Sequence, residues 1–123
     1  MTVLSSHLLI GSTGQHGAGI SVQIYSFDGN DHNKRELIAK VITDEQGRFK
    51  ADLSSVTALT QGVVQFEMVV SIEDLFSSDQ PSGLENPLTE IVVRFNIQPG
   101  QSIQHIPIII SPNSYSVWWS SPE

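Results

Sequence analysis

The stretch GVVQFEMVV at residues 62–70 decides the fold, because its apolar side chains recur at every second position. One face of an extended chain would then carry Val64, Phe66, Met68 and Val70. A period of two is the pattern of a β-strand, whereas an α-helix repeats its apolar positions every three or four residues. We therefore predict a strand here that packs one face into a core.

The same alternation continues outward along the chain in both directions. It predicts further strands at residues 3–9, 19–27, 36–43, 48–53, 90–97, 102–110 and 115–120. About eight short strands joined by turns favour an all-β fold, an antiparallel sandwich or barrel, formed as one domain over residues 1–123.

The segments between these strands have the composition of turns. Residues 11–19 are rich in glycine and residues 28–34 are polar, so both are predicted loops, and DEQG at 44–47 predicts a tight hairpin turn. The alternation stops after Ser71, which could cap a short helix over 72–78 with two acidic residues in its first turn.

Composition excludes several classes of function. The chain has 123 residues, no cysteine, and 13 acidic against 6 basic residues, for a net charge of -7. Without cysteine there is no disulfide framework and no thiolate metal site. The acidic balance and the lack of a basic cluster argue against binding to nucleic acid or to a membrane surface. No segment looks like a signal peptide or a membrane span, so we expect a cytoplasmic protein.

Two apolar stretches, Val63–Val70 and Ile106–Ile110, carry few charges. In a monomer such surfaces or edges would have to be covered, so they favour oligomerisation through strand faces or edges. The residues alone do not fix the number of subunits.

Four histidines stand at positions 7, 16, 32 and 105, and no two of them form an HxH or HxxxH pair. A metal site would have to be assembled from distant strands, and we expect neither a metal nor another cofactor. His16 and His32 lie in predicted loops and are interpreted as solvated side chains. His7 and His105 differ, because both lie within apolar strands.

The fuller apolar row beside His105 lies on the opposite face of its strand, at Ile106, Ile108 and Ile110. His105 is therefore predicted to point away from the core. Taken singly, His7 and His105 could serve only the structure, and Arg48 after the DEQG turn could be a surface cation. Trp118 and Trp119 alternate faces on a strand, which is compatible with one core residue and one rim residue.

In order along the chain, these pieces resemble the transthyretin and 5-hydroxyisourate hydrolase family. The similar segments are LSSHLL and GAGISVQIY near the N-terminus, TDEQGRF at 43–49 and QHIPIIISPNSYSVWWSS at 104–121. The most specific segment is SPNSYS at 111–116, and the likeness spans nearly the whole chain.

The resemblance implies an eight-stranded, two-sheet sandwich with one short helix, assembled as a homotetramer. It implies active sites in a channel at the dimer–dimer interface, where a small heterocyclic substrate binds. The family's catalytic trio falls on His7, Arg48 and His105. In the hydrolases these residues act when water opens a lactam ring. The hormone carrier transthyretin lacks the trio, so its retention favours an enzyme.

The sequence departs from the family at its C-terminus. The family's Tyr-Arg-Gly-Ser falls on Trp118, Trp119, Ser120 and Ser121, so only the final serine is kept. An indole donates a hydrogen bond but cannot accept one, unlike the tyrosine hydroxyl. We take these four positions as substrate-binding and expect a larger, flatter or more apolar substrate than 5-hydroxyisourate.

Three hypotheses remain open. The protein is a 5-hydroxyisourate hydrolase of purine breakdown, a family member that opens, cyclises or isomerises another heterocycle, or a non-enzymatic small-molecule-binding protein. The sequence does not decide among them. It also does not identify which histidine acts as the base.

Overall fold

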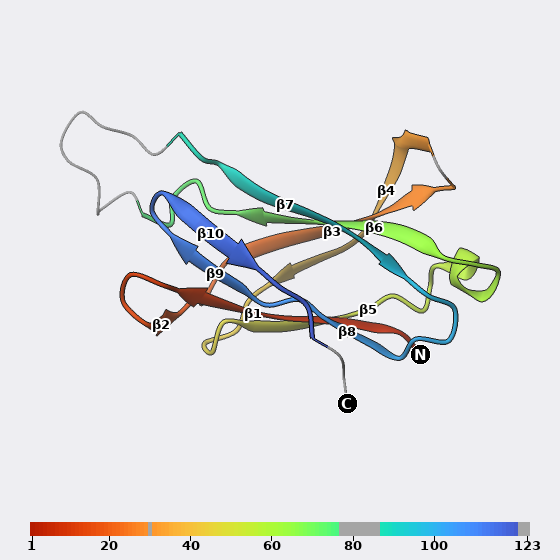
Figure 1. The fold of residues 1–123 in the computed structure, drawn as a ribbon, viewed down its shortest axis with the longest axis horizontal. Helices are drawn as coiled ribbons and strands as arrows, with labels where there is room; N and C mark the ends of the chain where they lie inside the picture. Colours follow the sequence, from red (N-terminus) through yellow and green to blue (C-terminus); the bar gives the residue numbers. More distant parts are fainter. Residues whose placement is uncertain (30, 77–86, 121–123) are drawn as a thin grey trace.

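The computed structural model describes residues 1–29, 31–76 and 87–120. Two β-sheets lie one above the other (Figure 1). The elements are β1 (Val3–Ile10), β2 (Gln15–His16), β3 (Ser21–Asp28), β4 (Asp31–Ile42), β5 (Arg48–Asp52), the 3-10 helix η1 (Thr57–Thr60), β6 (Val64–Ser71), β7 (Glu90–Ile97), β8 (Ile103–His105), β9 (Ile108–Ser111) and β10 (Ser114–Val117).

The larger sheet has six strands in the order β10-β9-β1-β2, with β5 and β8 also paired with β1. The smaller sheet has four strands in the order β4-β3-β6-β7. Neighbouring strands are antiparallel except where β1 pairs in parallel with β8 and with β9. The predicted all-β sandwich is confirmed, and β1 is the strand that joins most of the larger sheet.

The core lies between the sheets and follows the predicted alternation. The row that the stretch at 62–70 predicted is buried, as are its neighbours on the facing sheet: Leu4, Leu8, Val64, Phe66, Met68, Val70, Ile108 and Ile110. Burying one such side chain stabilises the fold by roughly 1.5–3 kcal/mol. This shared apolar layer holds β1 and β9 against β6, and thereby fixes the outer face of the larger sheet.

The predicted short helix and the predicted loop at 28–34 differ in the structure. The short helix predicted over 72–78 is not found at residues 72–76, which form a turn. The turn follows β6, which continues through Ser71 and its pairing with Glu90. Residues 77 and 78 lie outside the described part. A short helix occurs instead as η1. The predicted loop at 28–34 gives way to β4 at Asp31, where pairing with β3 extends the strand.

The predicted strand at 102–110 is divided into β8 and β9. Pro107 has no N–H to donate to a ladder, and the break falls at Ile106 and Pro107. Ile106 N instead donates to Ser5 O at 3.0 Å, so the chain stays attached to β1 across the break. The last predicted strand, 115–120, ends as β10 at Val117, followed by an isolated bridge between Ser120 and His105.

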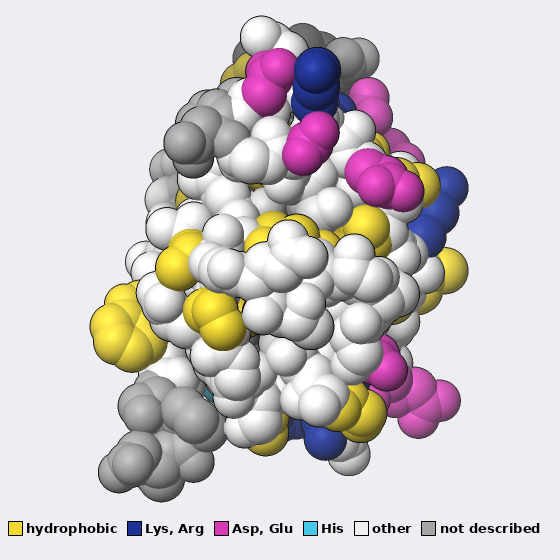
Figure 2. Space-filling model, turned by 90° about the vertical axis from the view of Figure 1, so that its right-hand side faces the viewer, with side chains coloured by type: hydrophobic (Ala, Val, Ile, Leu, Met, Phe, Trp, Pro, Cys, Tyr) yellow, Lys and Arg dark blue, Asp and Glu magenta, His cyan; other side chains and the backbone are white. Residues whose placement is uncertain are grey.

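Most of the two stretches that suggested association is covered within this chain, although Val63 is 53% exposed. β6 lies between β3 and β7, and Ile106, Ile108 and Ile110 are buried. They do not by themselves require a partner. On the face shown in Figure 2, Lys and Arg side chains stand apart and form no single basic patch. No helix in the described ranges has the length and apolar character needed to cross a bilayer.

Candidate active site

The predicted catalytic residues lie on the outer face of the larger sheet. Along β1, Leu4, Ser6 and Leu8 are buried in the core, whereas Ser5 and His7 alternate with them and are only half-buried. The strands that carry the catalytic candidates, β1, β5 and β8, run side by side in the lower layer of Figure 1. The outer face therefore leaves these side chains accessible to a small molecule.

Arg48 begins β5 and is the cross-strand partner of His7. Antiparallel partners project their side chains from the same face, so the guanidinium group and the imidazole are neighbours. The Arg48 side chain is exposed. Its charge is close enough to act on the pKa of His7, which it lowers.

The turn at residues 44–47 determines where Arg48 stands. The Asp44 carboxylate accepts hydrogen bonds from the backbone N–H of Gln46 at 2.9 Å and of Arg48 at 3.0 Å. The bond from Arg48, followed by that from Gln46, lowers the pKa of Asp44. Asp44 therefore stays ionised and closes the turn directly before β5.

Gly47 attaches this turn to β1. Its carbonyl accepts the Leu8 N–H at 2.7 Å, and its φ is +74°. A Cβ at this position would lie 2.3 Å from the Leu8 carbonyl oxygen. Glycine is required here for both reasons, because other residues rarely adopt positive φ and none could avoid that contact. The predicted tight turn is confirmed, but it is not a hairpin, because β4 and β5 belong to different sheets. It sets Arg48 opposite His7.

His105 ends β8 and pairs with Ser5 of β1 in parallel register. The Ser5 hydroxyl lies 2.7 Å from His105 Nδ1, which is a hydrogen-bond distance. His105 is half-buried, and the isoleucines of the opposite row are buried. The prediction that His105 points away from the core is confirmed, and Ser5 orients its ring.

His16 is also on this face. It pairs with Leu9 across β1 and β2, and its Nδ1 lies 3.3 Å from His7 Nε2. The two ring centroids are 5.5 Å apart. His16 was interpreted as a solvated loop residue. Its side chain is exposed as expected, but its contact with His7 was not predicted. His32 lies in β4, in the other sheet.

The pKa of His7 is lowered from its usual value. Burial is the largest cause, followed by the charge of Arg48, while a hydrogen bond to the Gln46 backbone acts in the opposite direction. His16 and His105 add smaller lowering effects. His7 is therefore neutral near neutral pH, which is the state in which an imidazole can accept a proton.

Trp118 and Trp119 lie at the edge of the sandwich. They border a crevice of about 480 Å³ together with Val93, Phe95, Gln104 and Ile106, and none of His7, Arg48 and His105 lines it. Trp118 is 41% exposed and Trp119 is 73% exposed, so the expectation of one core tryptophan is wrong.

The other two C-terminal positions differ from each other. Ser120 bridges His105, donating its N–H to the His105 carbonyl at 3.2 Å. Ser120 therefore lies beside His105, whereas Ser121 is outside the described residues. Within the described ranges, no three metal-ligating side chains lie close enough to hold a metal ion.

Residues 4–119 match the family described as HIUase/Transthyretin. This chain belongs to that family. Among similar proteins, the 5-hydroxyisourate hydrolase of Pseudomonas aeruginosa is 30% identical over 122 residues, covering 96% of this chain and 90% of that protein. The 5-hydroxyisourate hydrolase of Mesorhizobium japonicum is 30% identical over 120 residues, covering 96% of this chain and 91% of the other.

Solved structures of the family share the fold. The 5-hydroxyisourate hydrolase of Klebsiella pneumoniae superposes with a TM-score of 0.70 at 26% identity, covering 98% of this chain and 100% of that one. Transthyretin from Sparus aurata superposes with a TM-score of 0.72 at 16% identity, covering 95% of each chain. The second likeness concerns the fold alone.

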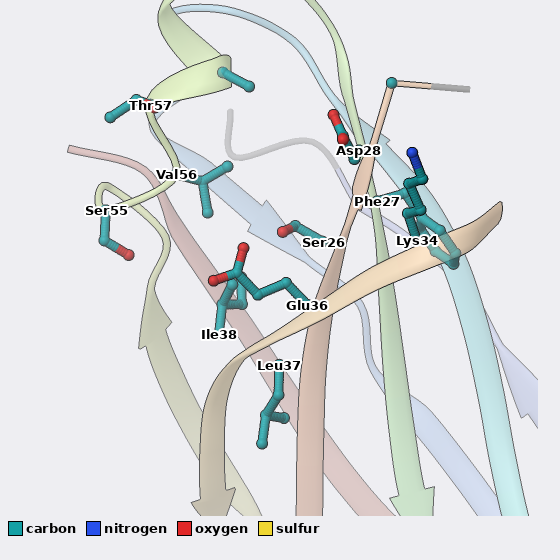
Figure 3. Close-up of a pocket in the computed structure, with 12 residues that line it drawn as sticks. Ser26, Phe27, Asp28, Lys34, Glu36, Leu37, Ile38, Ser55, Val56 and Thr57 are labelled. Carbon is teal, nitrogen blue, oxygen red and sulfur yellow. The ribbon is translucent and has the colours of Figure 1, made fainter. Parts of the chain in front are cut away.

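In this family member, sequence reasoning missed two residues at the site, Ser5 and His16. Alternation along β1 puts Ser5 on the same face as His7, but only the β1–β8 register brings it to His105. A second cavity, of about 530 Å³, lies away from the site between β4 and residues 55–58. Figure 3 shows Glu36 and Ser26 pointing into it, and none of the proposed catalytic residues lines it.

Proposed function

We propose that this member of the HIUase/Transthyretin family hydrolyses the lactam ring of 5-hydroxyisourate or of a closely related purine-derived heterocycle. The observation that carries the proposal is the meeting of His7, Arg48 and His105 on one sheet face, through the β1–β5 and β1–β8 registers. The 5-hydroxyisourate hydrolases among its relatives support the same activity.

The chemistry needs an activated water and two proton transfers. One histidine takes a proton from water while the oxygen adds to the lactam carbonyl. The C–N bond then breaks, and the ring nitrogen takes a proton from the other histidine. A neutral His7 and a His105 oriented by Ser5 are suited to these steps, and such general catalysis is typically worth about 10²–10⁴ in rate.

Arg48 supplies the charge that the reaction needs. The adding water leaves negative charge on the carbonyl oxygen, and a guanidinium group stabilises it with paired N–H donors. Arg48 is exposed beside His7, so its donors can reach a ring that lies over the sheet. No step in this sequence requires a metal or another cofactor.

We also propose that the protein acts as a cytoplasmic homotetramer, with its sites between dimers. The outer face exposes apolar as well as polar side chains, and Ile103, two positions before His105, is 41% exposed. Covering such a face with a second dimer would bury these side chains and enclose the substrate. Mass measurement in solution tests this part separately.

A second candidate is a family member that acts on another heterocycle. The exposed Trp118 and Trp119 favour it, because they stand where the family carries Tyr-Arg and remove a cation from the C-terminal segment. Wide aromatic side chains there would suit a larger, flatter or more apolar ring. Ser120, which bridges His105, would then contact that ring.

The decay of freshly prepared 5-hydroxyisourate, followed by absorbance, tests the main proposal. Wild type should accelerate the decay, and His105→Gln should remove most of that acceleration. His32→Gln is the matched control, because His32 belongs to the other sheet and should leave the rate unchanged. A wild-type rate equal to spontaneous decay would overturn the proposal.

A further inference from the structure

His16 makes a contact that the catalytic trio does not account for. Its Nδ1 is 3.3 Å from Nε2 of His7, with the two rings inclined by 33°. His16 itself is exposed, whereas His7 is half-buried. The pair therefore forms a short path of two imidazoles from the outer face of the sheet to solvent.

The position of His16 is fixed by the backbone around it. Its pairing with Leu9 places it diagonally across from His7, within reach of a ring. Directly after it, Gly17 donates its N–H to the Leu8 carbonyl at 2.8 Å, and its own carbonyl accepts the Thr43 hydroxyl at 2.6 Å. The loop that carries His16 is thus attached to β1 and to the end of β4.

One nitrogen of His7, Nε2, faces His16 at 3.3 Å, and a hydrogen bond with the Gln46 backbone acts on the same ring. When His7 becomes an imidazolium ion, its Nε2 carries a proton and donates it to Nδ1 of His16. His16 is therefore placed to accept the Nε2 proton that His7 gives up.

We propose that His16 is a proton relay that connects His7 of the candidate active site with solvent. The inference rests on the proposed hydrolysis, because ring opening to a carboxylate with a neutral nitrogen product releases one proton per turnover. His7 passes its Nε2 proton to Nδ1 of His16, and His16 releases its own Nε2 proton to water. Only N–H and O–H bonds are made or broken in the relay: the water that accepts the proton becomes hydronium, and no electrons are transferred.

The surrounding charges favour this direction. Arg48 of β5 and His105 of β8 both repel a proton on His7, and His16 does the same when it is charged. On the solvent side, Asp44 in the turn interacts favourably with a charged His16. A proton on His7 is thus disfavoured by the charges around it.

Turnover of 5-hydroxyisourate at increasing imidazole concentration tests the relay, at constant ionic strength and pH. In dilute buffer, His16→Gln should lower kcat about tenfold and leave KM unchanged, and added imidazole should restore the rate by carrying the proton itself. Gln15→Ala is the matched control, because Gln15 is the other residue of β2 and is equally exposed. His16→Asn repeats the test with a shorter amide.

NMR titration of ¹⁵N-labelled histidines gives a readout that needs no substrate. Replacing His16 by Gln should raise the pKa of His7, because one lowering effect is lost. An active wild type with an unchanged His16→Gln rate, or a loss that imidazole does not restore, would overturn the relay. If the wild type is inactive, the proposed hydrolysis and the relay are both overturned. If His7 and His16 still titrate together in that case, only the pairing of their rings remains.

Discussion

Removing the Ser5 hydroxyl should impair His105 without disturbing the sheet. Ser5→Ala deletes the group that lies 2.7 Å from His105 Nδ1, and alanine is compatible with the half-buried position in β1. The hydrogen bond fixes the ring plane and the nitrogen that carries the proton. Its loss leaves a half-buried imidazole without this orienting partner.

The size of the effect follows from that one bond. A hydrogen bond of ordinary strength contributes about 0.5–1.5 kcal/mol net. Since 1.36 kcal/mol corresponds to a factor of ten in rate, kcat should fall by roughly three- to tenfold. KM should change little, because Ser5 acts on His105 and not on the substrate.

Steady-state hydrolysis of 5-hydroxyisourate measures this loss. Ser5→Thr keeps the hydroxyl and should retain most of the activity. Ser116→Ala is the matched control, because Ser116 pairs with Ile109 on the same outer face and lies in β10, away from Ser5. Wild-type kcat in Ser5→Ala, or an equal loss in Ser116→Ala, would refute the reasoning.

Four further predictions concern the turn, the charge beside His7, His7 itself and the C-terminus. Gly47→Ala should lower the free energy of unfolding by more than the roughly 1–3 kcal/mol of a strained backbone, because its Cβ would also meet a carbonyl, and chemical denaturation measures this. Arg48→Ala should raise the pKa of His7, as NMR titration would report. The pKa of His7 is lower in the folded protein than its unfolded value of about 6.5. This difference stabilises the fold above that pH, and the stabilisation is lost as the pH falls through the folded pKa. His7→Gln should therefore make the thermal stability less dependent on pH in this range. Replacing Trp118 and Trp119 by Tyr and Arg should raise turnover of 5-hydroxyisourate; a fall would favour a different native heterocycle.

Alternation alone predicted the sheets because burial in a sandwich repeats every second residue. The stretch at 62–70 and the row opposite His105 both lie where period two places them. Element ends were less predictable. Residues 31–34 have loop composition, yet they belong to β4, where Asp31 pairs with Asp28 of β3 and the register shifts before Arg35. That pairing depends on a partner strand and not on local sequence.

The face of a residue was also easier to predict than its exposure. Alternation puts Glu67 on the face of β6 opposite the row of Val64 and Phe66, yet Glu67 is only 3% exposed. Arg35 and Arg94, from the strands β4 and β7, both form ion pairs with its carboxylate and cover it. Two chain segments far from residue 67 therefore determine its burial.

The site shows the same division. The faces of His7 and His105 followed from their own strands, and the turn sequence placed Arg48. The contact between Ser5 and His105 joins residues 100 positions apart in the sequence, through a parallel pairing that no local pattern indicates. His16 lies in a glycine-rich segment, so its composition predicted a loop and gave no sign of its neighbour.

The most direct test of the central claim compares 5-hydroxyisourate decay in wild type, His7→Gln, His105→Gln and the double variant. When two residues act in one catalytic unit, replacing either one removes most of the rate that both provide. The loss of rate in the double variant is then far smaller than the product of the two single losses. We predict clear acceleration by wild type, a large loss in each single variant and little further loss in the double variant. Independent, multiplying losses, or a wild type no faster than spontaneous decay, would contradict the claim that these histidines form one hydrolytic site.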